Sequence, residues 1–283
     1  MKSVLISGCS SGIGLYTVEA LQRDGWEVFA TARKEEDINN LKYKGFDTQF
    51  LDVTDSTSIK DVVEYVDDKT RGKLYGLINN AGCGYSGALE DISRETMRRQ
   101  FEVNVFGVHE LTRRIIPIFR KNKCGRIINI SSAAGKFATP FMGAYSASKF
   151  ALEAISDVLR IELRNTGIKV IIIEPGPVKS DFSKNALDIF QKIVKPRESH
   201  FREVYVKMEK YRKTKEARRP LPGPEVVYRK IKDALESRNP RTRYPVTLTA
   251  YLASYLKRIL PDKLLDILIT FYLDKKYGKL YEN

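Results

Sequence analysis

Short apolar runs alternate with amphipathic segments along the first 175 residues of the chain. Near-continuous runs such as Val-Ile-Ile-Ile at 170–173 are typical of strands that helices cover on both faces of a sheet. The segments between these runs repeat apolar residues at helical spacing, as Ile13, Val18 and Leu21 do. The predicted strands are 3–7, 26–32, 48–51, 74–79, 126–131 and 168–174, and the predicted helices are 12–24, 35–43, 56–68, a long helix ending near 122, and 145–165. This order predicts an α/β fold with one doubly wound parallel sheet.

The alternation stops after Pro177. A polar, mostly helical stretch rich in Lys, Arg and Glu then runs to 219, and three prolines precede an amphipathic helix predicted over 225–237. Residues 243–246 are predicted as one more strand, and 248–273 as two short apolar helices separated by Pro261. We expect a single domain over 1–283, in which residues 181–283 form a mostly helical extension that covers the carboxyl edge of the sheet as a substrate lid.

The composition is that of a globular protein. Of the 283 residues, 42% are hydrophobic and 30% are charged, which excludes both a disordered and a membrane-embedded chain. The three cysteines form no C-x-x-C pair, so a reducing environment and no bound metal are expected. The N-terminus lacks a signal-peptide pattern, and the apolar stretch 264–273 is too short for a bilayer, which needs roughly 20 apolar residues. We therefore expect a cytoplasmic protein.

The net charge of +14 is unevenly distributed. Residues 1–180 carry 25 basic and 22 acidic groups, a net +3, whereas residues 181–283 carry 24 and 13, a net +11. The basic residues lack a nucleic-acid recognition module, so no specific nucleic-acid partner is expected. Apolar residues recur near helical spacing among the basic ones at Leu252, Leu256, Leu260, Leu264, Leu268 and Phe271. Such a stripe either packs over the cleft and core, which we favour, or lies on an anionic membrane surface.

A glycine-rich loop over 7–14, with the sequence Ser-Gly-Cys-Ser-Ser-Gly-Ile-Gly, follows the first predicted strand. Backbone N–H groups at the start of the next helix can bind a phosphate there. The spacing G-x-x-x-G-x-G is neither the strict G-x-G-x-x-G dinucleotide fingerprint nor a P-loop, which continues with Lys and then Ser or Thr. By itself the loop predicts either a phosphate site or a structural turn.

Further motifs make residues 3–180 resemble the short-chain dehydrogenase/reductase family. In chain order the matching motifs are the glycine loop with Gly8, Gly12 and Gly14, then Asn79-Asn80-Ala81-Gly82, Asn104, Ser132, Tyr145 with Lys149, and Pro175-Gly176. The family often has Thr where this chain has Ser7 and Ser180, and both replacements keep a hydroxyl. The resemblance implies a Rossmann-type fold, a nicotinamide cofactor bound by residues 1–180, and an oxidoreductase that interconverts a carbonyl and an alcohol.

The resemblance also implies a role for each matching residue. Asn104, Ser132, Tyr145 and Lys149 correspond to the catalytic set, in which Asn104 holds a water between Lys149 and solvent. The residues expected to contact the cofactor are Gly8, Ser10, Ser11, Gly12, Ile13, Gly14, Arg33, Asp52, Val53, Asn80, Ala81, Gly82, Tyr145, Lys149, Pro175, Gly176, Val178 and Ser180. Those expected to contact the substrate are Cys83, Ser132, Met142, Tyr145 and Phe182. A homodimer or homotetramer paired through helices at about 100–122 and 146–165 is implied as well.

Elementary chemistry supports the catalytic set without the family name. Tyr145 and Lys149 are four residues apart on one predicted helix, so their side chains share a face. A nearby ammonium lowers the pKa of a phenol, which lets Tyr145 exchange a proton with a substrate oxygen. Ser132 follows a strand at the sheet edge where ligands bind, and its hydroxyl can hold that oxygen. In an arbitrary chain, such a Tyr and Lys are more often a solvated pair.

The second predicted strand ends in Ala32-Arg33-Lys34, where NAD-binding proteins usually carry a carboxylate for the ribose. Two cations and no carboxylate at this point favour NADP(H) over NAD(H). Alternatively, Arg33 and Lys34 are solvated loop charges that Glu35 and Glu36 partly neutralise. A non-catalytic dinucleotide-binding regulatory protein is the alternative function on this fold, although such a protein is expected to lack the Tyr or the Lys.

The closest resemblance is to the branch that contains 17β-hydroxysteroid and retinol dehydrogenases. It rests on residues 145–153, Arg243-Tyr244 and residues 260–265. This branch implies a lipophilic ketone, aldehyde or alcohol as the small-molecule substrate. The candidate pocket residues are Cys83, Tyr85, Phe141, Met142, Val178 and Phe182, and plain core or lid packing explains any of them equally well.

Overall fold

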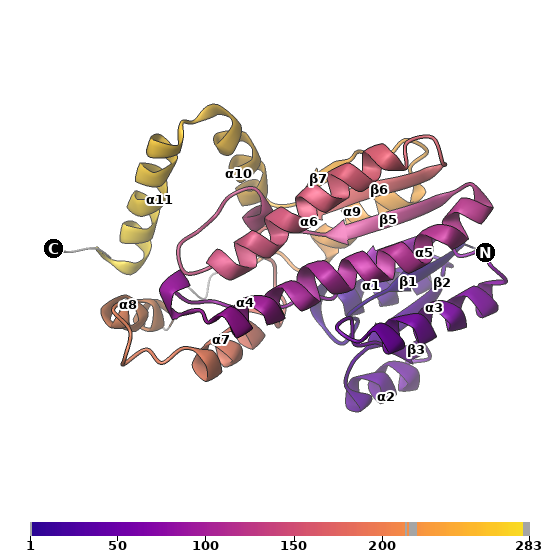
Figure 1. Ribbon diagram of the computed structural model, residues 1–283, viewed down its shortest axis with the longest axis horizontal. Coiled ribbons are helices and arrows are strands. Elements are labelled where there is room, and N and C mark those ends of the chain that lie inside the picture. Colours follow the sequence, from indigo (N-terminus) through magenta and orange to yellow (C-terminus); the bar gives the residue numbers. More distant parts are fainter. Residues whose placement is uncertain (1, 213, 215–219, 280–283) are drawn as a thin grey trace.

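Seven parallel strands form one sheet in the computed structural model, which describes residues 2–212, 214 and 220–279 (Figure 1). The strands are β1 (Ser3–Ile6), β2 (Glu27–Ala32), β3 (Asp47–Phe50), β4 (Gly76–Asn79), β5 (Gly125–Ile130), β6 (Ile168–Glu174) and β7 (Arg243–Pro245). Their order across the sheet is β3-β2-β1-β4-β5-β6-β7. The predicted doubly wound sheet is confirmed, and the short strand expected near 243 closes its edge.

The helices follow the predicted alternation. They are α1 (Gly12–Arg23), α2 (Glu35–Tyr43), α3 (Ser56–Thr70), α4 (Arg94–Phe101), α5 (Val108–Asn122), α6 (Gly143–Glu162), α7 (Phe182–Ile193), α8 (Arg202–Arg212), α9 (Glu225–Glu236), α10 (Leu248–Ile259) and α11 (Asp262–Tyr277). Short 3-10 turns form η1 (Leu89–Asp91) and η3 (Ala133–Gly135), and a π-helical turn, η2 (Glu102–Gly107), separates α4 from α5. The long helix predicted to end near 122 is therefore interrupted, which its apolar spacing does not reveal.

Alternate strand residues point to opposite faces of the sheet, and each face is covered by helices (Figure 1). Val4 and Ile6 of β1 pack with residues of α1 and α9 in one apolar cluster. Leu5, between them, packs with residues of α3 and α5 in a second cluster. Burial on both faces explains the near-continuous apolar strands of the sequence.

A third apolar cluster lies outside the sheet and joins α7, α8 and α11. Phe141, from the segment before α6, packs in this cluster against Phe201 and Tyr205. The Phe141 side chain is 6% exposed and is part of this packing. The arrowhead of β5 points to the end of the molecule where these helices and α10 lie (Figure 1). The carboxyl ends of the strands therefore face the helical extension.

The apolar stripe of the last third is not buried as expected. Leu252, Leu264, Leu268 and Phe271 are 45–68% exposed, while Leu256 and Leu260 are partly buried. The favoured expectation that this stripe packs over the cleft and core is thus wrong for those four residues. No helix among residues 2–212, 214 and 220–279 is long and apolar enough to span a membrane.

Candidate active site

The glycine loop is held between β1 and the loop after β4 by close packing and hydrogen bonds. A Cβ on Gly14 would stand 2.2 Å from the Gly8 carbonyl oxygen, and a Cβ on Gly8, where φ is +72°, would stand 2.8 Å from the Ala81 Cα. The Asn80 side-chain amide donates to the Gly8 carbonyl oxygen at 2.7 Å. The Ser7 hydroxyl accepts from the backbone N–H groups of Asn80 and Ala81. Only glycine fits these two positions without moving the backbone.

The start of α1 offers the donors that an anion needs. Ser11 occupies its N-cap position, yet the Ser11 side chain makes no capping hydrogen bond. The first N–H groups of a helix carry partial positive charge and have no partner within the helix. Ser180 lies beside this turn, because a Cβ on Gly12 would stand 3.0 Å from its Cβ. The free donors at this helix start are the kind that a phosphate can accept from.

The cations at the end of β2 face solvent. Arg33 has a side chain that is 63% exposed, and its guanidinium lies 3.7 Å from the Asp52 carboxylate. Asp52 in turn accepts from the backbone and hydroxyl of Thr54 at 2.9 and 2.8 Å. Val53 is buried, and its carbonyl oxygen would stand 2.2 Å from a Cβ on Gly107. Arg33 at the end of β2 thus lies beside Asp52, which follows β3.

Tyr145 and Lys149 lie one turn apart on α6, as predicted, and both are buried. The Lys149 Nζ lies 5.8 Å from the centroid of the Tyr145 ring and donates to the Ile130 carbonyl oxygen at 2.8 Å. Burial raises the pKa of Tyr145 to about 12 although a hydrogen bond with Ser132 opposes the rise, and burial lowers the pKa of Lys149 to about 8. The expected lowering of the tyrosine pKa by the lysine is therefore wrong here, because burial disfavours the charged form of each group.

Asn104 lies in η2, and its side chain holds the segment that follows the Asn-Asn-Ala-Gly motif. Its carbonyl oxygen accepts from the Cys83 N–H, and its amide donates to the Cys83 carbonyl oxygen and the Ser148 hydroxyl, all at 3.0 Å. A Cβ on Gly82 would stand 3.4 Å from the Asn104 Oδ1 and 3.9 Å from the Lys149 Nζ. Asn104 and Lys149 therefore flank one glycine. The π-helical turn aims the Asn104 side chain at this loop, a placement that π turns often provide at functional sites.

Of the expected substrate residues, Phe182 packs on the phenol and Met142 precedes the same helix. The Phe182 ring lies 5.3 Å from that of Tyr145, centroid to centroid, and a Cβ on Gly84 would stand 2.6 Å from it. Met142 precedes α6, and its sulfur accepts from the Ser86 hydroxyl at 3.2 Å. Val178, in contrast, packs at the edge of the cluster that joins α1 and α9.

Cys83 and Tyr85 share one anchor on the loop after β4. The Gln100 side chain, which is fully buried, donates to the Cys83 carbonyl oxygen at 2.9 Å and accepts from the Tyr85 N–H at 2.8 Å. Burial raises the pKa of the Cys83 thiol to about 11, so this thiol is neutral at physiological pH. Gln100 was not among the residues predicted from the sequence.

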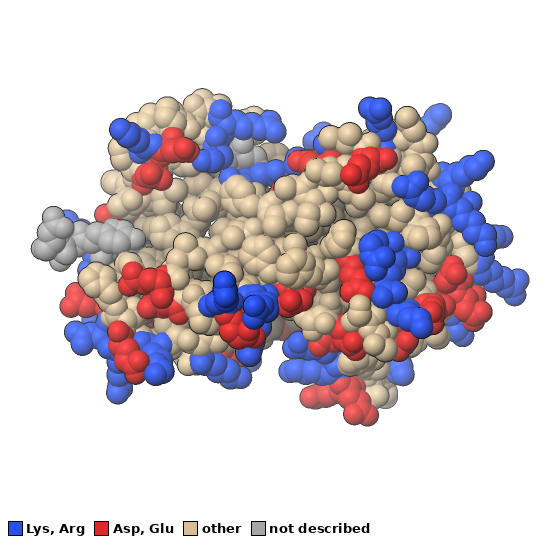
Figure 2. Space-filling view, in the orientation of Figure 1, with Lys and Arg blue, Asp and Glu red and all other residues tan. Residues whose placement is uncertain are grey.

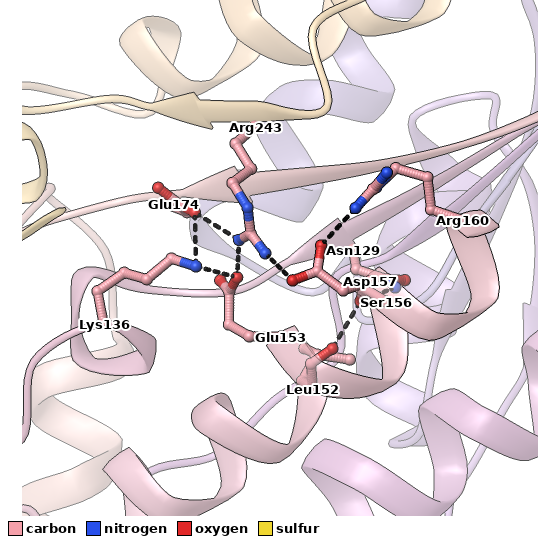
Figure 3. A network of polar contacts seen from close by, with 9 residues as sticks. All are labelled: Asn129, Lys136, Leu152, Glu153, Ser156, Asp157, Arg160, Glu174 and Arg243. Atoms are coloured by element: carbon pink, nitrogen blue, oxygen red, sulfur yellow. Dashed lines mark hydrogen bonds and ion pairs between the residues drawn. The ribbon is translucent and has the colours of Figure 1, made fainter. Parts of the chain in front are cut away.

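A polar network beneath α6 joins four elements that the sequence separates (Figure 3). Arg243 of β7 pairs with Glu153 of α6, with Glu174 of β6 at 3.0 Å, and with Asp157 of α6. Lys136, which follows η3, pairs with Glu153 at 2.8 Å and Glu174 at 3.6 Å. Glu153 and Glu174 are 5% and 1% exposed. The network links α6, which carries Tyr145, to β6 and β7 at the edge of the sheet.

Ser132 is connected to this network through η3. Its hydroxyl accepts from the Ala134 N–H at 3.1 Å, and the Ala133 N–H donates to the Pro175 carbonyl oxygen at 2.8 Å. A Cβ on Gly135 would stand 3.0 Å from the Glu153 Cγ. Sequence reasoning missed Lys136, Glu153, Glu174 and Arg243 as site residues. The available signal was weak: Glu153 lies four residues after Lys149, and Glu174 ends an apolar strand.

Comparison with known proteins shows the family to which the chain belongs. A model of the short chain dehydrogenase family matches residues 2–188. The chain belongs to the short-chain dehydrogenase/reductase family. It is 42% identical to the uncharacterized oxidoreductase YbbO of Escherichia coli (strain K12) over 94% of this chain and 93% of that one.

Other members of the short-chain dehydrogenase/reductase family match over similar spans. The chain is 34% identical to an NADPH-dependent 3-dehydrocapnine reductase of Ornithobacterium rhinotracheale, over 98% of both chains. It is 36% identical to 17-beta-hydroxysteroid dehydrogenase type 6 of Rattus norvegicus, over 95% of this chain and 87% of that one. The expected resemblance to hydroxysteroid dehydrogenases is confirmed, and the protein is an oxidoreductase of alcohol and carbonyl groups.

Solved structures confirm the dinucleotide-binding fold. A short-chain dehydrogenase from Burkholderia cenocepacia in complex with NADP superposes with a TM-score of 0.75 at 23% identity, covering 95% of this chain and 100% of that one. One from Burkholderia phymatum in complex with NAD superposes with a TM-score of 0.73 at 22% identity, covering 94% and 95%. Because the same fold carries either nucleotide, the preference for one depends on local residues.

The buried lysine leads to a prediction about stability and pH. The pKa of Lys149 is about 8 in the folded protein against an ordinary value of 10.5. Between these values the unfolded chain binds more protons, so the contribution of Lys149 to stability rises with pH, by at most about 1.4 kcal/mol per pH unit. Below pH 8 the penalty for the buried ammonium is fully present.

Urea unfolding of the wild type and Lys149→Met across this pH range measures the effect. The difference in unfolding free energy between them should shift in favour of the wild type between pH 8 and 10.5. Every other titrating group is common to both proteins. Stability curves that run parallel across this pH range would therefore contradict a lowered pKa of the buried Lys149.

Proposed function

We propose that the protein is an NADPH-dependent carbonyl reductase that uses Tyr145 as general acid on a lipophilic ketone or aldehyde. The observation that carries this proposal is the buried phenol, which has a raised pKa, a hydrogen bond with Ser132 and a lysine one turn away. A neutral phenol is the form that donates a proton, so the site suits reduction at neutral pH. The reverse reaction needs the phenolate.

In the proposed reaction Ser132, Tyr145 and Lys149 each have one role. The substrate carbonyl oxygen accepts hydrogen bonds from the Ser132 and Tyr145 hydroxyl groups. A bound reduced nicotinamide supplies the hydride that the carbonyl carbon gains. The oxygen takes the proton of the Tyr145 hydroxyl, and the phenolate regains a proton from the Lys149 ammonium. Lys149 then regains a proton from solvent, along a path beside Gly82 and Asn104.

The residues proposed to hold the nucleotide follow from the loops described above. The turn from Gly8 to Gly14 would receive the pyrophosphate, and Arg33 would pair with the 2′-phosphate. Asp52 and Val53 would contact the adenine, and the segments 80–82 and 175–180 would border the nicotinamide half. The extension over 181–283 would act as the substrate lid, since Phe182 already packs on Tyr145.

Arg33 provides a test of the preference for NADPH. Its exposed guanidinium lies 3.7 Å from the Asp52 carboxylate, a long ion pair, so a 2′-phosphate would gain a charge-assisted hydrogen bond there. Arg33→Ala should raise KM for NADPH by about tenfold or more and change KM for NADH by less than about twofold. Lys44→Ala, which removes an exposed cation paired with Glu19, is the matched control. Equal effects of Arg33→Ala on both cofactors would exclude this role.

A homodimer is the assembly we propose. Exposed apolar side chains lie on the helix pair that the family uses for dimers, at Phe106 of η2 and at Phe150, Val158 and Ile161 of α6. Exposed large apolar residues at helical spacing favour a partner helix over solvent.

A further inference from the structure

The helix pair α10–α11 exposes many large apolar side chains. Ten of the nineteen large apolar or tyrosine residues exposed in the described part of the chain belong to these two helices. On α10 they include Leu248, Leu252, Tyr255 and Ile259, which recur three or four residues apart. They therefore form one stripe along that helix. We call the exposed apolar side chains of α10 and α11 the outer face.

Packing among the residues that the structure describes buries one side of α11. Leu265 and Leu273 are buried, and Leu273 packs in the cluster that joins α7, α8 and α11. On the outer face, Ile267 and Phe271 lie four residues apart and are 62% and 68% exposed. A helix that is apolar on all sides is normally buried in protein or in lipid. The outer face therefore needs an apolar environment that the described residues of this chain do not supply.

The charges around the outer face favour an anionic occupant. Residues 248–279 carry six basic and three acidic side chains. Asp262 is already paired with Lys257 at 2.6 Å, while Arg258, Lys263 and Lys275 are exposed. Figure 2 shows Lys and Arg side chains, with fewer acidic ones, beside uncharged surface at the end of the molecule formed by α10 and α11. A second copy seated on this face would bring the same cations together, whereas anionic lipid headgroups would neutralise them.

The aromatic residues of the outer face fit the same environment. Tyr251, Tyr255 and Tyr272 are 37–62% exposed, and each combines an apolar ring with a polar hydroxyl. Tyrosines of this kind concentrate at the boundary between lipid headgroups and acyl chains. Helices with basic residues beside an apolar stripe lie in that boundary, parallel to the membrane.

We propose that the outer face of α10 and α11 docks the protein on the surface of an anionic membrane. The location of α10 gives this docking a consequence for the active site. Thr247 and Thr249 pack on Gly176, where a Cβ would stand 2.0 and 2.4 Å from their hydroxyl oxygens. Gly176 lies in the loop that follows β6, at the same sheet edge as Ser132 and Tyr145. If the proposed function holds, docking brings that edge to the lipid, where a lipophilic carbonyl is concentrated.

Vesicle co-sedimentation of the full chain without cofactor tests the docking separately from catalysis. The wild type should sediment with vesicles of phosphatidylcholine and phosphatidylglycerol, less so as salt is raised, and little with phosphatidylcholine alone. Phe271→Glu should lower the partition coefficient about tenfold or more, because it removes an inserted ring and adds a negative charge. Tyr43→Glu, which makes the same kind of change at a 95% exposed site on α2, should leave partition unchanged.

Two further measurements decide between the occupants. Thermal unfolding should be the same for Phe271→Glu and the wild type, which shows that the variant is folded. Failure of the wild type to bind anionic vesicles would overturn the proposal even if the enzyme is active. A change in oligomeric mass of Phe271→Glu, with vesicle binding unchanged, would overturn it in favour of a self-interface.

Discussion

Replacing Tyr145 with Phe is expected to slow NADPH-dependent carbonyl reduction by about 10²- to 10⁴-fold, the range that a lost general acid usually costs. The change removes only the hydroxyl that hydrogen-bonds with Ser132, while the ring that packs against Phe182 stays. Cofactor affinity, measured by the fluorescence of bound NADPH, should change little. The loss should therefore appear in kcat rather than in the binding of the nucleotide.

The assay follows NADPH oxidation by the wild type, Tyr145→Phe and Tyr85→Phe on a panel of ketones and aldehydes of increasing chain length. Tyr85→Phe is the matched control, because it removes a phenolic hydroxyl from the neighbouring loop and should retain most of the activity. If Tyr145→Phe matched the wild type on any accepted substrate, the assignment of Tyr145 as general acid would fail. If no substrate were reduced by the wild type, the proposed reaction itself would fail.

Arg243→Met is expected to destabilise the protein by about 3–5 kcal/mol at neutral pH, since breaking a buried ion pair leaves an uncompensated charge. Glu153 and Glu174 are both nearly inaccessible, and without Arg243 the cation that they share among the described residues is Lys136. Burial, followed by the neighbouring Glu153, already raises the pKa of Glu174. Removing the guanidinium raises it further, so the penalty should shrink as the pH falls and a carboxylate takes up a proton.

Urea unfolding of Arg243→Met, Arg243→Lys and Arg160→Met separates the network from ordinary surface pairing. Arg160 pairs with Asp157 at 3.1 Å, but both side chains are about two-fifths exposed, so its loss should cost less than about 1 kcal/mol. Arg243→Lys keeps the charge and should fall between the two. A cost for Arg243→Met no larger than that for Arg160→Met would show that the buried network contributes little.

Local patterns were sufficient to predict the strands, the glycine loop and the Tyr145–Lys149 pair. A strand covered on both faces must be apolar throughout, and residues four apart on a helix share a face. Both features can therefore be predicted from residues that are close in the sequence. The tight contacts of Gly8 and Gly14 likewise leave no alternative to glycine at those positions. The π-helical turn at Asn104 was not predictable, because it changes the hydrogen bonding of the backbone without interrupting the apolar spacing.

Electrostatics depended on burial, which spacing does not give. The four-residue interval suggests that Lys149 lowers the pKa of Tyr145, but exclusion of water from both side chains reverses the direction. The Arg243 network joins α6, β6, β7 and the segment after η3, which are 17 to 107 residues apart in sequence. No local pattern connects such residues, since only the folding of the chain brings them together.

The sequence alone was enough to predict the parallel sheet, the glycine loop and the Tyr145–Lys149 pair, because each rests on side chains that are neighbours in the chain or on one element. It also placed a stripe of apolar residues on the last two helices. The surroundings of that stripe became clear from the packing of the folded chain. Helical spacing says which residues share a side of a helix, whereas the packing of α8 against α11 and the exposure of Ile267 and Phe271 depend on every other element that covers the sheet edge.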